Sequence, residues 1–290
     1  MRGVMMVRDY EIDVARPACG SRLVYRTGCR PRALPCWMAL PANPAPDAPP
    51  LVAVHGIQRG ARDMAACLMA RATALGRTVI APLFGEAEWP AFQQVVRKGR
   101  ADLALLALLE DLHVEGVWDG GVFDLYGHSG GAQFSHRFAM LYPHRVRRLT
   151  LGAAGWYTVP DTERFPLGLG RRRAPTEDWG PRMADGLSSF LRLPIQVYVG
   201  ALDGQPDENT RRGPLIDSQQ GTHRLARARH WYGAVREAAT ARGIEPRMDL
   251  MILPGAGHDF LDCIRNGALL ERLLPDPSAG DGGTARAATA

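Results

Sequence analysis

Residues 122–140 read VFDLYGHSGGAQFSHRFAM and contain the pattern Gly-x-Ser-x-Gly at residues 127–131. An apolar run leads into this pattern, and a segment compatible with a helix follows it. Glycines flank Ser129 because the sharp turn from a strand into a helix leaves no space for larger side chains. The stretch therefore predicts a strained turn that lifts the Ser129 hydroxyl above a sheet. The helix N-terminus behind it favours developing negative charge.

The segments on both sides of this stretch alternate between strand-like and helix-like patterns. Strands are expected at residues 51–54, 78–83, 121–126, 146–152, 195–199 and 248–253, with possible edge strands at 9–15 and 32–40. Helices are expected at residues 61–75, 101–112, 130–141, 221–241 and 259–273. This alternation predicts an α/β fold in which helices cover both faces of a parallel sheet.

The chain of 290 residues is expected to form one domain that carries an insertion. The α/β core is assigned to residues 1–160 and 194–274. Residues 161–193 are rich in Pro, Gly and Arg and interrupt the alternation, so a small inserted cap is expected there. Residues 275–290, PDPSAGDGGTARAATA, have the composition of a disordered tail.

The basic residues are almost all arginines, because Lys98 is the single lysine, and the formal net charge is +5. They are scattered along the chain, and no zinc-finger, RNP or basic-zipper pattern accompanies them. A solvated arginine surface and no nucleic-acid partner are therefore expected, although an anionic partner or substrate stays open. No apolar stretch reaches the roughly 18–20 residues of a membrane span, so no membrane partner is expected.

The five cysteines are odd in number and form no C-x-x-C pair, so no metal site is expected. A disulfide among Cys19, Cys29 and Cys36 stays open at this stage. Asp9 and Glu11 occur before any apolar run of signal-peptide length, which indicates a cytoplasmic protein.

A serine hydroxyl is a weak nucleophile and needs a base and an acid that orients the base. His258 follows the expected strand 248–253, where the base of a Ser…acid…His order is found. Asp203 comes directly after the expected strand 195–199 and is the first candidate for the acid. Asp207 and Asp217 follow on the same loop and remain alternatives.

An acyl-transfer site also needs N–H donors for the negatively charged oxygen of its intermediate. Gly130 supplies one donor directly after the serine, and the second is expected from the loop after an early strand. His55-Gly56-Ile57-Gln58 forms such a loop. Ile57 is the first candidate for the oxyanion hole together with Gly130, and Gln58 is the second.

Aromatic residues follow two of the expected strands and are candidates for the walls of a substrate pocket. Phe84 and Trp89 follow one strand, and Trp156 and Tyr157 follow another. Ligands bind beyond the carboxyl ends of parallel strands, where these loops open. The alternatives are that these aromatic residues anchor the cap, or that arginines 171–173 hold an anionic substrate group.

Four segments in this order resemble the α/β-hydrolase superfamily. They are His55-Gly56, GHSGG at 127–131, VGALD at 199–203 and GAGHDF at 255–260, and the resemblance spans roughly residues 51–274. It implies a mostly parallel sheet of about eight strands and Ser–Asp–His catalysis without a cofactor. The compact cap and the helix-rich linker more weakly resemble small esterases of the polyhydroxybutyrate-depolymerase type.

The resulting expectation is a serine hydrolase that cleaves a carboxylic ester through an acyl-enzyme on Ser129. Its partner would be a small acyl substrate, and its oligomeric state stays open. Amide, peptide or thioester cleavage is the enzymatic alternative, because the same residues serve all of these reactions. A binding protein without activity on a hydrolase scaffold is the other alternative, because a fold does not determine a function.

Overall fold

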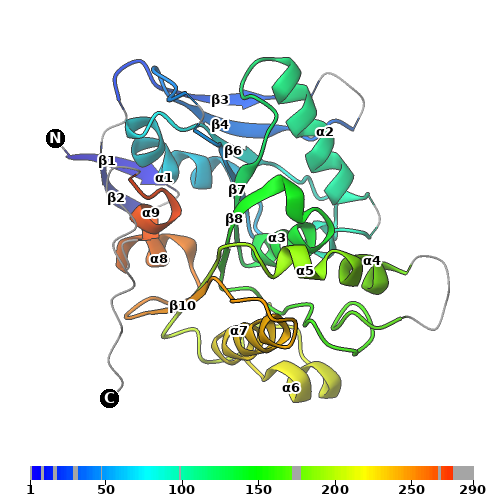
Figure 1. Ribbon diagram of the computed structural model, residues 1–290. Helices are drawn as coiled ribbons and strands as arrows, with labels where there is room; N and C mark the ends of the chain where they lie inside the picture. Colours follow the sequence, from blue (N-terminus) through cyan, green and yellow to red (C-terminus); the bar gives the residue numbers. More distant parts are fainter. Residues whose placement is uncertain are drawn as a thin grey trace.

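The protein consists of two β-sheets and the helices that pack on the larger sheet (Figure 1). This computed structural model describes residues 2–7, 10–15, 18–28, 32–46, 48–97, 99–171, 178–266 and 269–276. The smaller sheet is an antiparallel pair of β1 (Arg2–Val7) and β2 (Tyr10–Ala15).

The larger sheet has eight strands in the order β10-β9-β8-β7-β5-β6-β4-β3. Five neighbouring pairs, from β10 to β6, are parallel, and β4 and β3 extend the sheet in antiparallel pairing. The strands are β3 (Arg22–Arg26), β4 (Cys36–Leu40), β5 (Leu51–Val54), β6 (Val79–Pro82), β7 (Phe123–His128), β8 (Val146–Gly152), β9 (Ile195–Gly200) and β10 (Met248–Leu253). The predicted α/β class with a mostly parallel sheet of eight strands is confirmed.

Helices cover both faces of this sheet (Figure 1). On the buried strand β5, Leu51 and Ala53 join the core under one set of helices, whereas Val52 and Val54 join the core on the opposite face. This alternation explains why the strand is apolar without interruption. The first set is α1 (Ala61–Ala74), α8 (Phe260–Asn266) and α9 (Leu269–Leu273), and the opposite set includes α2 (Ala101–Val114), α3 (Gly130–Leu141) and α7 (Arg224–Thr240).

The structure corrects two details of the sequence prediction. The expected edge strand 32–40 forms only β4, which lies inside the sheet, because β3 pairs with its outer side. β3 escaped prediction because the exposure of its side chains does not alternate, and Tyr25 is 44% exposed. Of the expected last helix 259–273, the structure describes α8 and α9, and residues 267–268 lie outside the described residues.

The described part of segment 161–193 contains α4 (Trp179–Asp185) and α5 (Leu187–Phe190), and both helices contact α3. Its role as a cap stays a prediction. Of the expected tail, residues 277–290 lie outside the described residues. Within the described helices, none is long and apolar enough to cross a membrane.

The middle of the sheet contains a buried carboxylate that three arginines surround. Asp124 of β7 is 1% exposed and accepts hydrogen bonds from Arg77, Arg147 and Arg148, at Nη2–Oδ2 distances of 2.8, 2.6 and 3.2 Å. Burial of a charge is costly unless it is paired, and this cluster supplies the pairing. The cluster also joins β7 to β8 and to the loop before β6.

Replacing Asp124 by Ala is expected to lower the free energy of unfolding by about 3–5 kcal/mol, because it leaves the buried Arg77 and the largely buried Arg148 without their carboxylate. Urea denaturation measures this loss. Asp249→Ala is the matched control, since Asp249 is exposed on β10, and it should change stability by less than about 0.5 kcal/mol. A loss below about 1 kcal/mol for Asp124→Ala would contradict this account of the cluster.

Candidate active site

Ser129 occupies the turn between β7 and α3 in a strained backbone conformation. Its φ is 53° and its ψ is −114°, a region that side chains rarely adopt. A Cβ on Gly127 would lie 2.2 Å from the Gly131 carbonyl oxygen, and a Cβ on Gly131 would lie 2.0 Å from that of Val54. Both glycines are therefore required for α3 to begin so close to the sheet, as the sequence pattern indicated.

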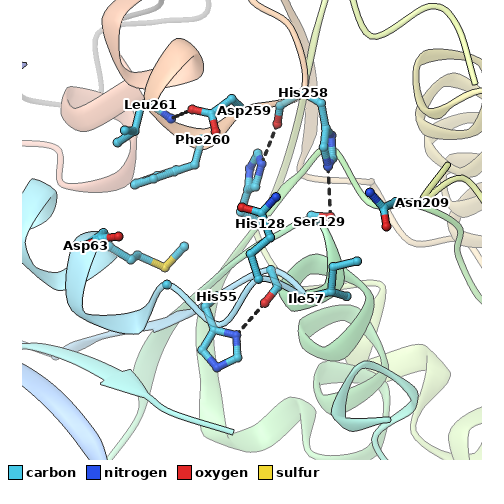
Figure 2. A pocket seen from close by; sticks show the side chains of 14 residues that line it. His55, Ile57, Asp63, His128, Ser129, Asn209, His258, Asp259, Phe260 and Leu261 are labelled. Carbon is cyan, nitrogen blue, oxygen red and sulfur yellow. Dashed lines mark hydrogen bonds between the residues drawn. The ribbon is translucent and has the colours of Figure 1, made fainter. Parts of the chain in front are cut away.

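Ser129, His258 and Asp203 form a continuous hydrogen-bonded chain. His258 Nε2 lies 3.1 Å from Ser129 Oγ (Figure 2), and His258 Nδ1 lies 3.0 Å from Asp203 Oδ2. A carboxylate can only accept, so Nδ1 carries the proton and Nε2 is free to accept from the serine hydroxyl. The three side chains come from the carboxyl ends of β7, β9 and β10, which meet at one edge of the sheet.

Arg224 distinguishes Asp203 from the alternative acids. Asp203 is 4% exposed, and its Oδ1 accepts from Arg224 Nη1 at 3.1 Å, which leaves Oδ2 for His258. Asp207 instead forms two bonds of 2.8 Å with Arg224, which holds the pKa of the Asp207 carboxyl well below its usual range. Asp217 accepts from Arg212 and Arg227. Of the three aspartates, Asp203 is the one that is hydrogen-bonded to His258.

Arg224 was not among the site residues expected from the sequence, because the arginines of this region have the pattern of a solvated surface. The side chains of Arg224 and Arg227 are 2% and 0% exposed. Both lie on the buried face of α7. The helical period places them on this face, but their charge argued for exposure to solvent. The expectation of a purely solvated arginine surface is therefore wrong for these two residues.

The loop that carries His258 lies directly against β9. Leu202 N donates to the Ala256 carbonyl at 3.0 Å, and Ala201 N donates to the Leu253 carbonyl at 2.9 Å. A Cβ on Gly200 would lie 2.3 Å from the Ala256 oxygen, so the close approach requires glycine at this position. The loop is thus fixed to the same strand that leads to Asp203.

The predicted oxyanion donors lie next to each other. A Cβ on Gly130 would lie 3.2 Å from Ile57 N, so the backbones of the two residues are adjacent. His55 Nε2 accepts from Phe84 N at 3.1 Å, so Nδ1 carries the proton and donates to the Gly56 carbonyl at 2.7 Å. Because the peptide bond is planar and trans, fixing this carbonyl directs the N–H of Ile57 to the opposite side.

A cavity of about 110 Å³ opens beside Ser129. Apolar side chains form part of its wall, and Asn209 lies on the opposite side of Ser129 from Asp63 and Phe260 (Figure 2). Gln58, the second oxyanion candidate, also lies at this cavity. The lining residues are His55, Gly56, Ile57, Gln58, Gly60, Asp63, Met64, His128, Ser129, Asn209, His258, Asp259, Phe260 and Leu261.

The four aromatic residues predicted to form pocket walls do not line this cavity. Phe84 is fully buried and stacks on Phe92 at 5.1 Å, and the indole of Trp89 donates to the Gly99 carbonyl at 3.1 Å. Their loop follows the strand as predicted, but the rings turn into the hydrophobic core. A sequence pattern locates such a loop and does not determine which way its side chains point.

Trp156 and Tyr157 are buried in the same way. Trp156 is 5% exposed and lies 4.1 Å from the guanidinium carbon of Arg137 and 4.8 Å from that of Arg211. Tyr157 is fully buried and stacks on Trp231 at 4.8 Å. These contacts stabilise the loop after β8 and give neither ring access to the cavity.

Two further sequence expectations involve residues that the structure describes only in part. Arg171 is exposed and pairs with Asp178, whereas positions 172 and 173 lie outside the described residues. Cys19 and Cys36 are free thiols, and Cys29 lies outside the described residues. In the part of the chain that the structure describes, no group of three His, Cys, Asp or Glu residues is placed to hold a metal ion.

No model of a known protein family and no curated protein sequence matches this chain. Solved structures do match. A poly(aspartic acid) hydrolase from Sphingomonas sp. KT-1 is 24% identical with a TM-score of 0.73, covering 89% of this chain and 99% of its own. A poly(3-hydroxybutyrate) depolymerase from Bordetella parapertussis is 27% identical with a TM-score of 0.68, covering 88% and 94%. A fluorophosphonate-binding serine hydrolase from Staphylococcus aureus is 12% identical with a TM-score of 0.56, covering 87% and 97%. The chain therefore has the fold of the α/β-hydrolase superfamily.

Gly131→Ala is expected to lower the melting temperature, because the new methyl group would collide with the Val54 carbonyl; overpacking of this kind costs about 1–3 kcal/mol or more. Gly233→Ala is the matched control, since nothing lies within 4 Å of the corresponding Cβ on α7. It should raise stability by up to about 1 kcal/mol through helix propensity. Thermal unfolding distinguishes the two, and an unchanged melting temperature for Gly131→Ala would contradict the proposed close contact.

The free energy of unfolding is expected to decrease as the pH falls from about 6.5 towards 4, because three buried histidines among the described residues resist protonation. Burial lowers the pKa of His55 to about 4, that of His128 to about 3 and that of His136 well below its ordinary value. The unfolded chain therefore binds more protons in this window, which favours unfolding at low pH. Each such proton contributes about 1.4 kcal/mol per pH unit.

Urea denaturation at a series of pH values measures this slope. His128→Gln removes one of the histidines and should make the slope shallower by about one proton. His230→Gln changes an exposed histidine of α7 and should leave the slope as it is. Identical slopes for all three proteins would contradict the assignment of His128 as a neutral buried group.

Proposed function

We propose that this protein is a serine hydrolase that cleaves a carboxylic ester through an acyl-enzyme on Ser129. The observation that carries the proposal is the chain of hydrogen bonds from Ser129 Oγ through His258 to Asp203, at 3.1 and 3.0 Å. This arrangement is the one that activates a serine hydroxyl by a neighbouring base. It stands beside a cavity and beside two backbone N–H groups, as acyl transfer requires.

In the proposed acylation step, Ser129 Oγ attacks the ester carbonyl carbon while His258 Nε2 takes the hydroxyl proton. The carbonyl oxygen becomes negatively charged and accepts hydrogen bonds from the N–H groups of Ile57 and Gly130. Asp203 stabilises the imidazolium that forms and retains its Nδ1 proton. His258 then donates the captured proton to the leaving alcohol, and the acyl group stays on Ser129.

In the proposed deacylation step, a water molecule enters where the alcohol left. His258 removes a proton from this water, which attacks the acyl carbon, and the same oxyanion donors hold the second intermediate. Collapse of that intermediate releases the carboxylic acid, and the serine oxygen takes the proton back from His258. The cycle needs water as its one co-substrate.

The size of the cavity favours a short acyl group. Its volume of about 110 Å³ is small beside the ~300–1,000 Å³ typical of sites for drug-sized ligands. Met64, Phe260 and Leu261 provide apolar contacts, and Asn209 provides a polar group. The similarity to the structure named as a poly(3-hydroxybutyrate) depolymerase, at 27% identity, supports ester cleavage.

Ser129→Ala should lose about 10⁴- to 10⁶-fold in turnover of p-nitrophenyl esters, because it removes the nucleophile. A fluorophosphonate probe should label Ser129 in the wild type and nothing in this variant, as read by peptide mass mapping. Ser135→Ala is the control, since Ser135 is a buried serine on the same helix, and it should stay active. An adduct on another serine would remove Ser129 from its role, and no labelling at all would favour a binding protein.

In an acyl series from acetate to palmitate, kcat/KM should decrease with chain length. Matched amides and thioesters tested beside the esters separate the proposed activity from its alternatives. Faster turnover of an amide than of the ester with the same acyl group would overturn the proposal of an ester hydrolase while leaving the serine mechanism in place.

Asp203→Asn should lower kcat by about 10³- to 10⁴-fold, because an amide no longer holds His258 in the required tautomer. Asp207→Asn should lower kcat less than tenfold, since Asp207 contacts Arg224 and is not hydrogen-bonded to His258. Steady-state kinetics with one p-nitrophenyl ester compare the two, and circular dichroism checks their folding. The reverse order of effects would assign the acid to Asp207.

A further inference from the structure

His128 directly precedes Ser129 and is buried, and the proposed reaction does not use its side chain. Its Nε2 lies 2.8 Å from the backbone carbonyl oxygen of His258 (Figure 2). Its Nδ1 lies 3.0 Å from the hydroxyl of Tyr198, which lies 2.5 Å from the hydroxyl of Tyr126. A buried chain of three polar side chains thus ends on the main chain of the proposed base.

The direction of every hydrogen bond in this chain follows from the acceptor at one end, the carbonyl oxygen of His258. A carbonyl oxygen can only accept, so His128 Nε2 carries the proton and donates to His258. Nδ1 must then accept, and the Tyr198 hydroxyl donates to it. Since the Tyr198 proton is used in this way, the Tyr126 hydroxyl donates to Tyr198. Each proton has one place, and His128 is held in one tautomer.

The registry of the sheet builds this contact. His128 of β7 pairs with Gly152 of β8, and Gly152 pairs with Tyr198 of β9, so the three residues form one row across three strands. Strands two positions apart are about 10 Å from each other, and a side chain between them would separate the outer two. A Cβ on Gly152 would lie 2.3 Å from the Tyr198 hydroxyl oxygen. Glycine at this position therefore lets Tyr198 reach His128.

Burial keeps the whole chain uncharged. Tyr126 and Tyr198 are 0% exposed, and burial raises the pKa of both hydroxyls well above the ordinary value. Desolvation, followed by the proximity of His258, lowers the pKa of His128. A neutral His128 does not repel the imidazolium that His258 becomes when it takes the serine proton.

The loop before His258 is held on one side by backbone bonds from β9 up to Ala256. Beyond that point, Gly257 gives the main chain freedom to rotate. The bond from His128 is made at the main chain of His258 itself, whereas Asp203 is bonded to the imidazole. It restricts the backbone from which the imidazole projects towards Ser129.

We propose that His128 is a positioning residue for the proposed base, and that the hydrogen bond from its Nε2 to the His258 carbonyl keeps the imidazole aligned between Asp203 and Ser129. This inference rests on the proposed function, since it assigns His258 as the base. Displacement of a reacting group by about 1 Å costs on the order of 100-fold in rate, so a tie of this kind has a measurable effect.

His128→Leu and His128→Gln form the first matched pair of variants. Leucine fills a similar volume without a donor, whereas the glutamine amide places an N–H near the position of the histidine Nε2. His128→Leu is expected to lower kcat for a p-nitrophenyl ester by about 10- to 100-fold, with KM changed less than about threefold. His128→Gln should recover kcat to within about fivefold of the wild type.

Tyr198→Phe and Tyr126→Phe form the second pair, because each removes one fully buried hydroxyl. Tyr198→Phe leaves His128 Nδ1 without its donor and should lower kcat about 3- to 10-fold. Tyr126→Phe leaves the Tyr198–His128 bond in place and should change kcat less than twofold. Tyr198→Phe breaks two hydrogen bonds and Tyr126→Phe breaks one, so Tyr198→Phe should also lose more stability in urea denaturation. A merely structural role predicts wild-type kcat for both variants under conditions in which both are fully folded.

A readout without turnover separates this inference from the proposed function. The proton NMR signal of the His258 Nδ1–H, hydrogen-bonded to Asp203, should be present in the wild type and in His128→Gln and be lost or shifted in His128→Leu. Wild-type kcat in a folded His128→Leu variant with an unchanged signal would overturn the inference. Equal losses in His128→Leu and His128→Gln would also overturn it. Failure of Ser129 to react with the phosphonate probe would instead remove the proposed function and leave the NMR comparison decisive for the position of His258.

Discussion

The candidate active site depends on how closely α3 approaches the end of β5. With a side chain at position 131, a Cβ would lie 2.0 Å from the Val54 carbonyl oxygen, and α3 would have to move away. Glycine there brings Ser129 next to the loop that follows β5, and a Cβ on Gly56 would lie 3.4 Å from that of Ser129. The proposed nucleophile and the proposed oxyanion donors are therefore adjacent because of one contact between backbones. The strain at Ser129, whose φ is 53°, is the local cost of this arrangement.

Those parts of the fold and the candidate site that depend on short stretches of chain were predictable from the sequence. The strand 51–54, the helix 130–141 and the strand 248–253 have the bounds that their patterns predicted. Spacing also located the loops of Ser129 and His258. It made Asp203 the first candidate for the acid but left Asp207 as an alternative, because both follow β9 on one loop. Arg224, 21 residues beyond Asp203, is hydrogen-bonded to both and separates their positions, and such a long-range contact has no local signal.

The amino-acid composition was most misleading for arginine, because several arginines that were expected on the solvated surface are buried. Arg137 is 1% exposed, and burial lowers the pKa of its guanidinium to about 9. It donates to the Thr158 hydroxyl and to the carbonyl oxygens of Gln93 and Gln133, so it connects α3 with two loops. Arg224 and Asp124 are likewise buried charged groups, and their hydrogen-bond partners are themselves charged. In this protein a buried charged residue can be identified only from the partners that surround it in the folded structure. A count of charged residues along the chain would place the same residue on the surface.

The side chain and the main chain of His258 are contacted by different chemistry. The imidazole is hydrogen-bonded to Asp203, which is paired with the charged Arg224. The carbonyl oxygen accepts from His128, the end of a neutral chain that continues to Tyr198 and Tyr126. In the proposed reaction, a charged group in place of His128 would either repel the imidazolium or compete with Asp203 for its proton. A buried neutral network instead fixes one geometry because each of its donors has one acceptor. The row His128–Gly152–Tyr198 shows how the sheet provides this: pairing of β7, β8 and β9 sets the spacing, and the missing side chain at Gly152 lets the outer two residues meet.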